Sequence, residues 1–96
     1  MTVVHVPSPL FSYTGNRADV TAAGATLNEI LLDLDRQFPG FRFRVIDEQD
    51  RIRPTILFYI GGAVTRNLLQ FVGAADEVHI IAATNWSRFR VTWPPL

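Results

Sequence analysis

The sequence predicts an α+β fold, in which one long helix packs against one face of a mixed sheet of four to five strands. One amphipathic helical segment lies between Ala25 and Gly40, and short strand-like segments precede and follow it. Turn signals rich in Gly, Pro and Asn separate these segments. A helix with a single apolar stripe must bury that stripe against another element, so we expect it to cover one face of the sheet.

The helix is the most strongly patterned part of the chain. Thr26 is a suitable N-cap, and Glu29 stands three residues later, which is the spacing of a capping box. Pro39 disfavours helical geometry in the preceding residue, and Gly40 allows the chain to turn away. The apolar stripe is formed by residues at offsets of three and four: Leu27, Ile30, Leu31, Leu34 and Phe38. Asp33 lies off this stripe.

Alternating and β-branched segments predict the strands. We expect strands over residues 2–7, 18–23, 55–60 and 77–82, with a brief return at 63–64 after the Gly61-Gly62 turn. Residues 41–46 fit either a helical turn or an irregular segment, and the charged residues 47–53 are expected to form an exposed loop. The first and last strands should be parallel neighbours at the sheet centre, because the helix lies in the crossover between them.

Composition excludes several classes of function. Nine acidic residues balance nine basic ones, so no strong field favours nucleic acid or a membrane surface. The chain has no Cys and no Lys, which excludes disulfides, thiolate metal sites and Schiff-base chemistry. The N-terminus does not resemble a signal peptide, and no apolar run reaches the ~20 residues of a bilayer span. We therefore expect a soluble cytoplasmic protein.

No group of residues predicts catalysis. His5 and His79 fall in the first and last strands, so their rings would be close if these strands pair. Two histidines without a Cys and without a nearby acidic third ligand make a poor zinc site. We expect both rings to lie on the solvent face of the sheet and to bind no metal. No serine lies in a nucleophile context either, so we expect no catalytic residue, no cofactor and no enzymatic activity.

Several local strings, in the right order and at matching spacings, resemble the ubiquitin-like β-grasp proteins of the MoaD/ThiS sulfur-carrier family. The strings are Ser8–Gly15, Gly24–Leu31, Phe38–Phe41, Ile56–Gly62 and Asp76–Ile81. The resemblance covers residues 3 to 83 and is closest to the MoaD and cysteine-biosynthesis branch. It implies a β-grasp domain over residues 1–83 and a C-terminal tail over 84–96.

The resemblance ends where the family's chemistry resides. Members end in Gly-Gly, and a partner enzyme adenylates that terminal carboxylate before it becomes a thiocarboxylate. Here Trp86-Ser87 occupies the Gly-Gly positions, and no Gly follows Gly73, so trimming of the tail would not expose one. The Pro94-Pro95-Leu96 end is also stiffened by two fixed φ angles. We therefore expect that the chain lacks sulfur-carrier chemistry.

The resulting expectation is a non-catalytic protein-binding module that docks on a protein partner, such as a MoaD/ThiS-type activating enzyme or synthase subunit. The candidate contacts are Phe58 or Leu57, together with Tyr59, on the exposed sheet face, and Trp86, Phe89 and Trp93 in the tail. The tail aromatics could instead fold back and cover the sheet, and both interpretations stay open. The alternative function is a sulfur carrier in molybdopterin, thiamine or cysteine biosynthesis that works through an atypical or processed C-terminus.

Overall fold

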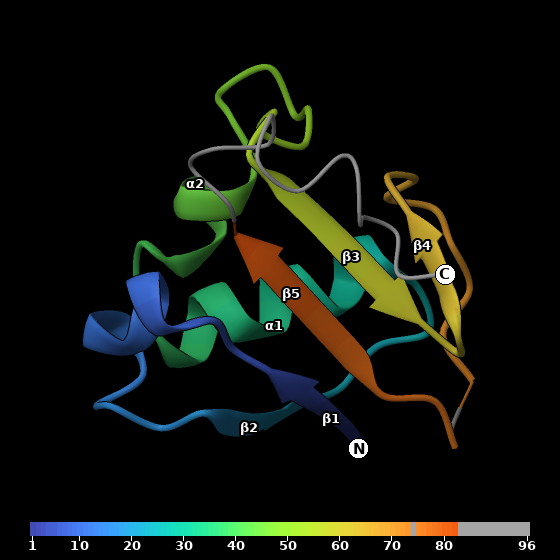
Figure 1. The fold of residues 1–96 in the computed structure, drawn as a ribbon, viewed down its shortest axis with the longest axis horizontal. Helices are drawn as coiled ribbons and strands as arrows, with labels where there is room; N and C mark the ends of the chain where they lie inside the picture. Colours follow the sequence, from blue (N-terminus) through green and yellow to red (C-terminus); the bar gives the residue numbers. More distant parts are fainter. Residues whose placement is uncertain (74, 83–96) are drawn as a thin grey trace, which may run out of the picture.

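The computed structural model describes residues 1–73 and 75–82, and these residues form one sheet with helices packed on it (Figure 1). The elements in chain order are β1 (Thr2–His5), the 3-10 helix η1 (Ser8–Tyr13), β2 (Asp19–Ala22), α1 (Leu27–Gln37), α2 (Phe41–Val45), β3 (Ile56–Ile60), β4 (Ala63–Thr65) and β5 (Val78–Ala82). The expected α+β class is confirmed.

The sheet has five strands in the order β2-β1-β5-β3-β4. The parallel pair β1 and β5 lies at its centre, as the sequence predicts, with Val4 opposite Val78 and His5 opposite His79. The pairs on either side are antiparallel. The β3–β4 hairpin turns at Gly61-Gly62, where both residues have positive φ, as a tight two-residue hairpin requires.

The core lies between the sheet and α1, which passes behind the strands in the view of Figure 1. The Thr26 hydroxyl oxygen accepts the Glu29 N–H at 3.3 Å, so the predicted N-cap is confirmed. The Glu29 side chain reaches back one residue further than in a standard capping box and accepts the Ala25 N–H at 2.9 Å. Four residues of the apolar stripe are fully buried: Leu27, Ile30, Leu31 and Leu34. Phe38, the fifth, is partly buried and packs against the edge of the core.

Asp33 is buried, although the apolar periodicity of α1 predicts that it faces away from the core. Its side chain is only 8% exposed, although the residue lies off the apolar stripe. It accepts the Ala23 N–H at 3.0 Å and is paired with Arg36 and Gln37 of the same helix. This carboxylate therefore ties the end of β2 to α1, a role that hydrophobic periodicity does not report.

The segment between α2 and β3 is less exposed than its charge suggests. Ile46 and Ile52 are both buried and form an isolated antiparallel bridge, so the segment folds back on itself beneath its charged residues. The five-residue helix α2 resolves the two interpretations of residues 41–46 in favour of a helical turn. Within the described residues, no helix is long and apolar enough to cross a membrane.

Candidate protein-binding face

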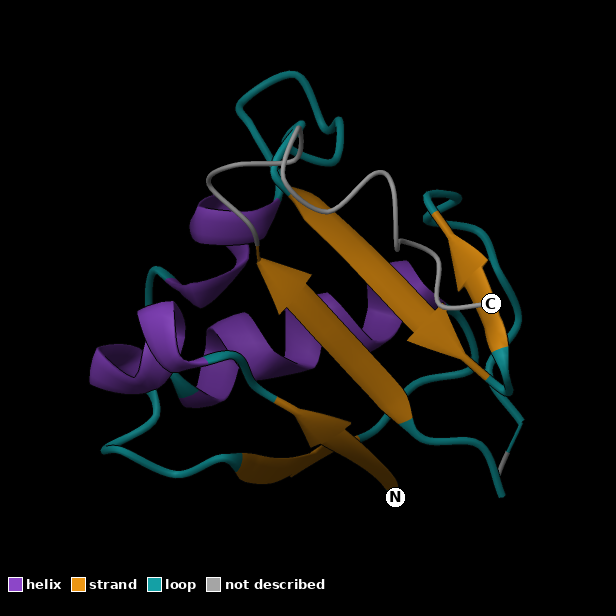
Figure 2. Cartoon of the chain, in the orientation of Figure 1, coloured by secondary structure: helices purple, strands orange, loops and turns teal. Residues whose placement is uncertain are grey.

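The expected partner contacts Leu57 and Tyr59 lie on the face of the sheet opposite α1. Side chains alternate along each strand, so every second residue turns away from the helix. In Figure 2 the strands lie in front of α1, with this face toward the viewer. We call it the open face, and its members are Val3, His5, Asp19, Thr21, Leu57, Tyr59, Val64, His79 and Ile81.

One row of side chains crosses the open face through all five strands. The strand register places Asp19, His5, His79, Tyr59 and Val64 opposite one another in succession. The two imidazole rings are stacked, with centroids 4.2 Å apart and an interplanar angle of 14°. The tyrosine ring stands edge-on to His79 at 6.4 Å and 83°. The sequence-based expectation that the two histidines are close and on the solvent face is confirmed.

His5 lies between two carboxylates. Its Nδ1 is 2.8 Å from Asp19 Oδ1 on β2, and its Nε2 is 2.5 Å from Glu77 Oε1 just before β5. The hydrogen bond to Glu77 is the main cause that raises the pKa of the imidazole above its ordinary value, with Asp19 adding to it and partial burial opposing it. The side chain is 31% exposed, so this arrangement is accessible at the surface. The expected strand over residues 77–82 already places Glu77 two residues before His79 and on the same face, and the structure adds the contact between its carboxylate and His5.

The structure separates the candidate contacts on β3. Leu57 and Tyr59 lie on the open face and are half-buried, so both are available to a partner. Phe58 is fully buried and points into the core between the sheet and α1. The expectation that Phe58 contacts a partner is therefore wrong, because the strand alternation turns its side chain to the core face.

The other candidate contacts, Trp86, Phe89 and Trp93, lie outside the described residues. The open face also contains two half-buried aliphatic residues that sequence reasoning did not select, Val3 and Ile81. The register places Ile81 opposite Leu57, so these residues extend the apolar part of the face across the central strands. The alternation within each strand could have identified them once the core-facing residues were assigned.

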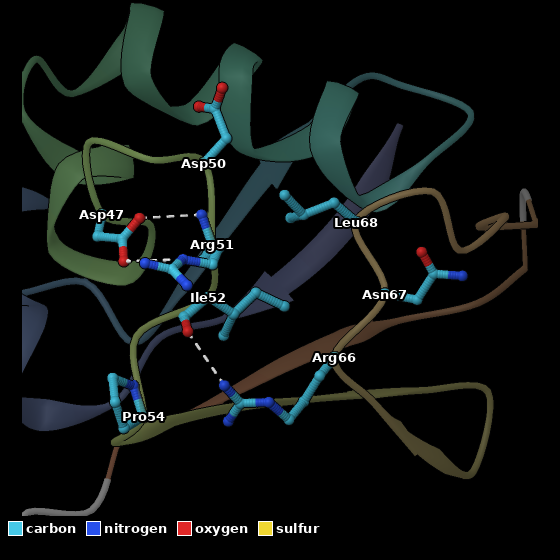
Figure 3. Close-up of a pocket in the computed structure, with 8 residues that line it drawn as sticks. All are labelled: Asp47, Asp50, Arg51, Ile52, Pro54, Arg66, Asn67 and Leu68. Carbon is cyan, nitrogen blue, oxygen red and sulfur yellow. Dashed lines mark hydrogen bonds and ion pairs between the residues drawn. The ribbon is translucent and has the colours of Figure 1, made fainter.

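A second candidate site is a hollow of about 640 Å³ beside the charged segment that precedes β3 (Figure 3). Its walls come from that segment and from the connector after β4. The lining residues are Asp47, Asp50, Arg51, Ile52, Pro54, Arg66, Asn67 and Leu68.

The charged groups of this hollow are used within the protein. Asp47 Oδ1 accepts the Gln49 and Arg51 N–H groups at 2.9 and 3.0 Å, and the hydrogen bond from Arg51 is the main cause that lowers the pKa of Asp47. Arg66 donates to the carbonyls of Ile52 and Ile56 at 3.0 and 3.1 Å. These contacts hold the segment in place, and the described residues that line the hollow offer no convergent set of groups that would bind a ligand.

Comparison with family models gave no match, and comparison with curated proteins gave none either. Solved structures do match. A chain of the crystal structure of the Amycolatopsis orientalis BexX/CysO complex is 28% identical, with a TM-score of 0.82 over 88% of this chain and 97% of that one. The crystal structure of Mycobacterium tuberculosis CysO is 25% identical, with a TM-score of 0.82 over 88% of this chain and 100% of that one.

The chain is also similar, at lower sequence identity, to the solution structure of small archaeal modifier protein 1 from Methanosarcina acetivorans. It is 18% identical, with a TM-score of 0.74 over 86% of this chain and 92% of that chain, and it supports the fold alone. The arrangement of one long helix on a five-stranded mixed sheet is consistent with the high structural similarity to these proteins. The chain therefore has the ubiquitin-like β-grasp fold.

Proposed function

We propose that this chain is a MoaD/ThiS-like β-grasp module that binds a protein partner through its open face and lacks thiocarboxylate chemistry. The observation that carries the proposal is the composition of that face. Leu57, Tyr59 and Ile81 form a half-buried apolar centre on the middle strands, and Asp19, Glu77 and the two histidines supply polar groups beside it. An apolar centre with a polar margin is the usual composition of a protein interface.

The likeness to the BexX/CysO structure supports the same conclusion, because that structure is of a complex. We propose that the partner of this chain is a MoaD/ThiS-type activating enzyme or synthase subunit, as the resemblance to that family implies. The proposed organisation is a binding domain over residues 1–83 followed by a tail over 84–96, with Trp86, Phe89 and Trp93 as further contacts.

Two positions near the C-terminus count against carrier chemistry. Activation requires a slim, flexible peptide that can thread a narrow channel, and glycine supplies this because it has no side chain. Trp86-Ser87 stands at the positions that the family pattern gives to Gly-Gly. A tryptophan side chain is too bulky for a channel shaped to glycine.

The second candidate is a sulfur carrier that uses an atypical or processed C-terminus. The 28% identity to a chain of the BexX/CysO complex favours it, because the likeness covers the fold and most of both chains. Both candidate functions use the open face for binding, but only a sulfur carrier would have its C-terminal carboxylate adenylated. A test for that modification therefore distinguishes the two functions.

The docking proposal is tested by titrating the protein against a MoaD-type activating enzyme. Leu57→Arg places a charge in the centre of the open face, and we expect it to weaken binding by about 30-fold or more, the range of a central interface residue. The control is Leu32→Arg on the outer side of α1, where the side chain is already 50% exposed. Equal affinities for the two variants, or no binding by the unmodified protein, would contradict the proposal.

A further inference from the structure

Three polar side chains at the open face, His5, Glu77 and His79, are close enough to one another to serve as metal ligands. Sequence reasoning expected none because it found no acidic ligand near the two histidines, and the fold supplies one in Glu77. One ligand atom from each of His5, Glu77 and His79 lies within 4.8 Å of the other two. We propose that these three side chains bind a divalent transition-metal ion of the Zn²⁺ type.

The strand register explains how the three ligands come together. His5 and His79 are direct partners in the parallel β1–β5 pair, so their rings stand side by side on one face. Glu77 stands two residues before His79, and its carboxylate oxygen reaches His5 Nε2 at 2.5 Å. All three ligands therefore belong to the two central strands or their immediate ends, which are held by the sheet rather than by a long loop.

Metal binding requires one of the two stacked imidazole rings to turn, because nitrogen lone pairs lie in the ring planes and two nearly parallel rings do not direct them at one point. Zinc–nitrogen and zinc–oxygen bonds of about 2.0–2.2 Å in tetrahedral geometry place ligand atoms about 3.3–3.5 Å apart. The present separations of up to 4.8 Å shrink to this range by side-chain rotation, while the 2.5 Å contact between His5 and Glu77 opens to admit the ion. The cluster is at the surface, with Glu77 55% exposed, so these rotations meet little resistance from packing.

A hydrogen bond with Asp19 orients the imidazole ring of His5. Asp19 Oδ1 is 2.8 Å from His5 Nδ1, which is the carboxylate–histidine arrangement that usually stands behind a metal-bound imidazole. When His5 is neutral, this bond places the ring proton on Nδ1 and leaves the Nε2 lone pair directed at the proposed ion. If His5 is instead protonated on both nitrogens, metal binding at Nε2 releases to solvent the proton that lies between Nε2 and Glu77, and the Nδ1 proton stays in the hydrogen bond to Asp19.

Charge and ligand type favour the same kind of ion. With both imidazoles neutral, the two carboxylates give the cluster a formal charge of −2, which a divalent cation balances. Two nitrogens and one carboxylate oxygen suit zinc and its neighbours in the first transition row better than calcium or magnesium, which prefer oxygen alone. Three protein ligands leave a coordination position that water fills.

The test is a calorimetric titration of the untagged full chain with Zn²⁺ in a neutral, non-chelating buffer, in which zinc hydroxide does not precipitate. We expect one ion per chain. Glu77→Gln and His79→Ala should each weaken binding by about 10-fold or more, and Asp19→Asn, which removes the orienting carboxylate, should weaken it by about 10- to 100-fold. Glu48→Gln, in the exposed segment before β3, is the matched control and should leave affinity unchanged.

Imidazole ¹⁵N spectra supply a second readout that does not depend on variants. Zn²⁺ should shift the metal-facing nitrogens of His5 and His79 together, with saturation at one equivalent. The proposal is overturned if Zn²⁺ at 1 mM produces no saturable change, or if Glu77→Gln and His79→Ala bind as tightly as the control. Either result would mean that His5 is a proton-bridged contact between Asp19 and Glu77 only.

Discussion

Leu34 and Leu32 lie two residues apart on α1 in opposite environments. Leu34 is fully buried against the sheet, whereas Leu32 is 50% exposed on the outer side of the helix. Both are interior helix positions, so replacement by Ala changes the intrinsic helix propensity similarly at the two sites. The difference between Leu34→Ala and Leu32→Ala therefore isolates the contribution of burial.

The magnitude follows from the buried groups that are removed. Leu→Ala deletes three carbon groups at about 0.8 kcal/mol each, which gives about 2.4 kcal/mol of lost transfer free energy. The cavity that remains adds to this, so we expect Leu34→Ala to lower the free energy of unfolding by about 2–5 kcal/mol. For Leu32→Ala we expect a change within about 0.5 kcal/mol, typical of a surface site.

Urea denaturation followed by circular dichroism measures both variants, with unchanged m-values as the sign that the same two states are compared. A loss for Leu34→Ala below about 0.5 kcal/mol, or an equal loss for the two variants, would refute the assignment of the buried helix face.

Two further predictions concern the junction between β2 and α1. Gly24→Ala should lower the melting temperature, because a Cβ there would lie 2.7 Å from Glu29 Cβ and 2.8 Å from the Ile30 nitrogen; an unchanged melting curve would contradict this close approach. The hydrogen bonds from Arg36 and then Ala23 lower the pKa of Asp33, so its stabilising effect is present above the ordinary carboxyl pKa and is lost as pH falls through the lowered value. Asp33→Asn should melt at a lower temperature near neutral pH and lose part of the acid dependence; identical pH profiles would exclude this role.

The sequence predicted the fold well because the local signals agreed with one another. The stripe from Leu27 to Leu34 and the cap at Thr26 predict the helix from spacing alone, and the crossover then requires the parallel β1–β5 pair. Phe58 was harder to place, because the composition of residues 55–60 predicts a strand but does not say which alternate set faces the core.

Contacts between distant residues limited what could be predicted of the site. His5 and Glu77 are 72 positions apart, and their contact depends on the register of β1 against β5. Asp33 likewise accepts an N–H from the end of β2, which no helical period reveals. The expected strand pairing brings His5 and His79 together, but it does not reveal the side-chain contact between His5 and Glu77, which depends on the exact register.

The proposal that this chain lacks carrier chemistry is tested most directly by intact-mass spectrometry after incubation with ATP, a sulfur donor and a MoaD-type activating enzyme. We predict an unchanged mass for the full chain. A variant that ends in Gly-Gly directly after Asn85 serves as the matched comparison, and we expect it to gain adenylation if its open face fits the enzyme. An acyl-adenylate, or a gain of one oxygen-to-sulfur exchange, on the unmodified chain would contradict the account and identify the protein as a carrier.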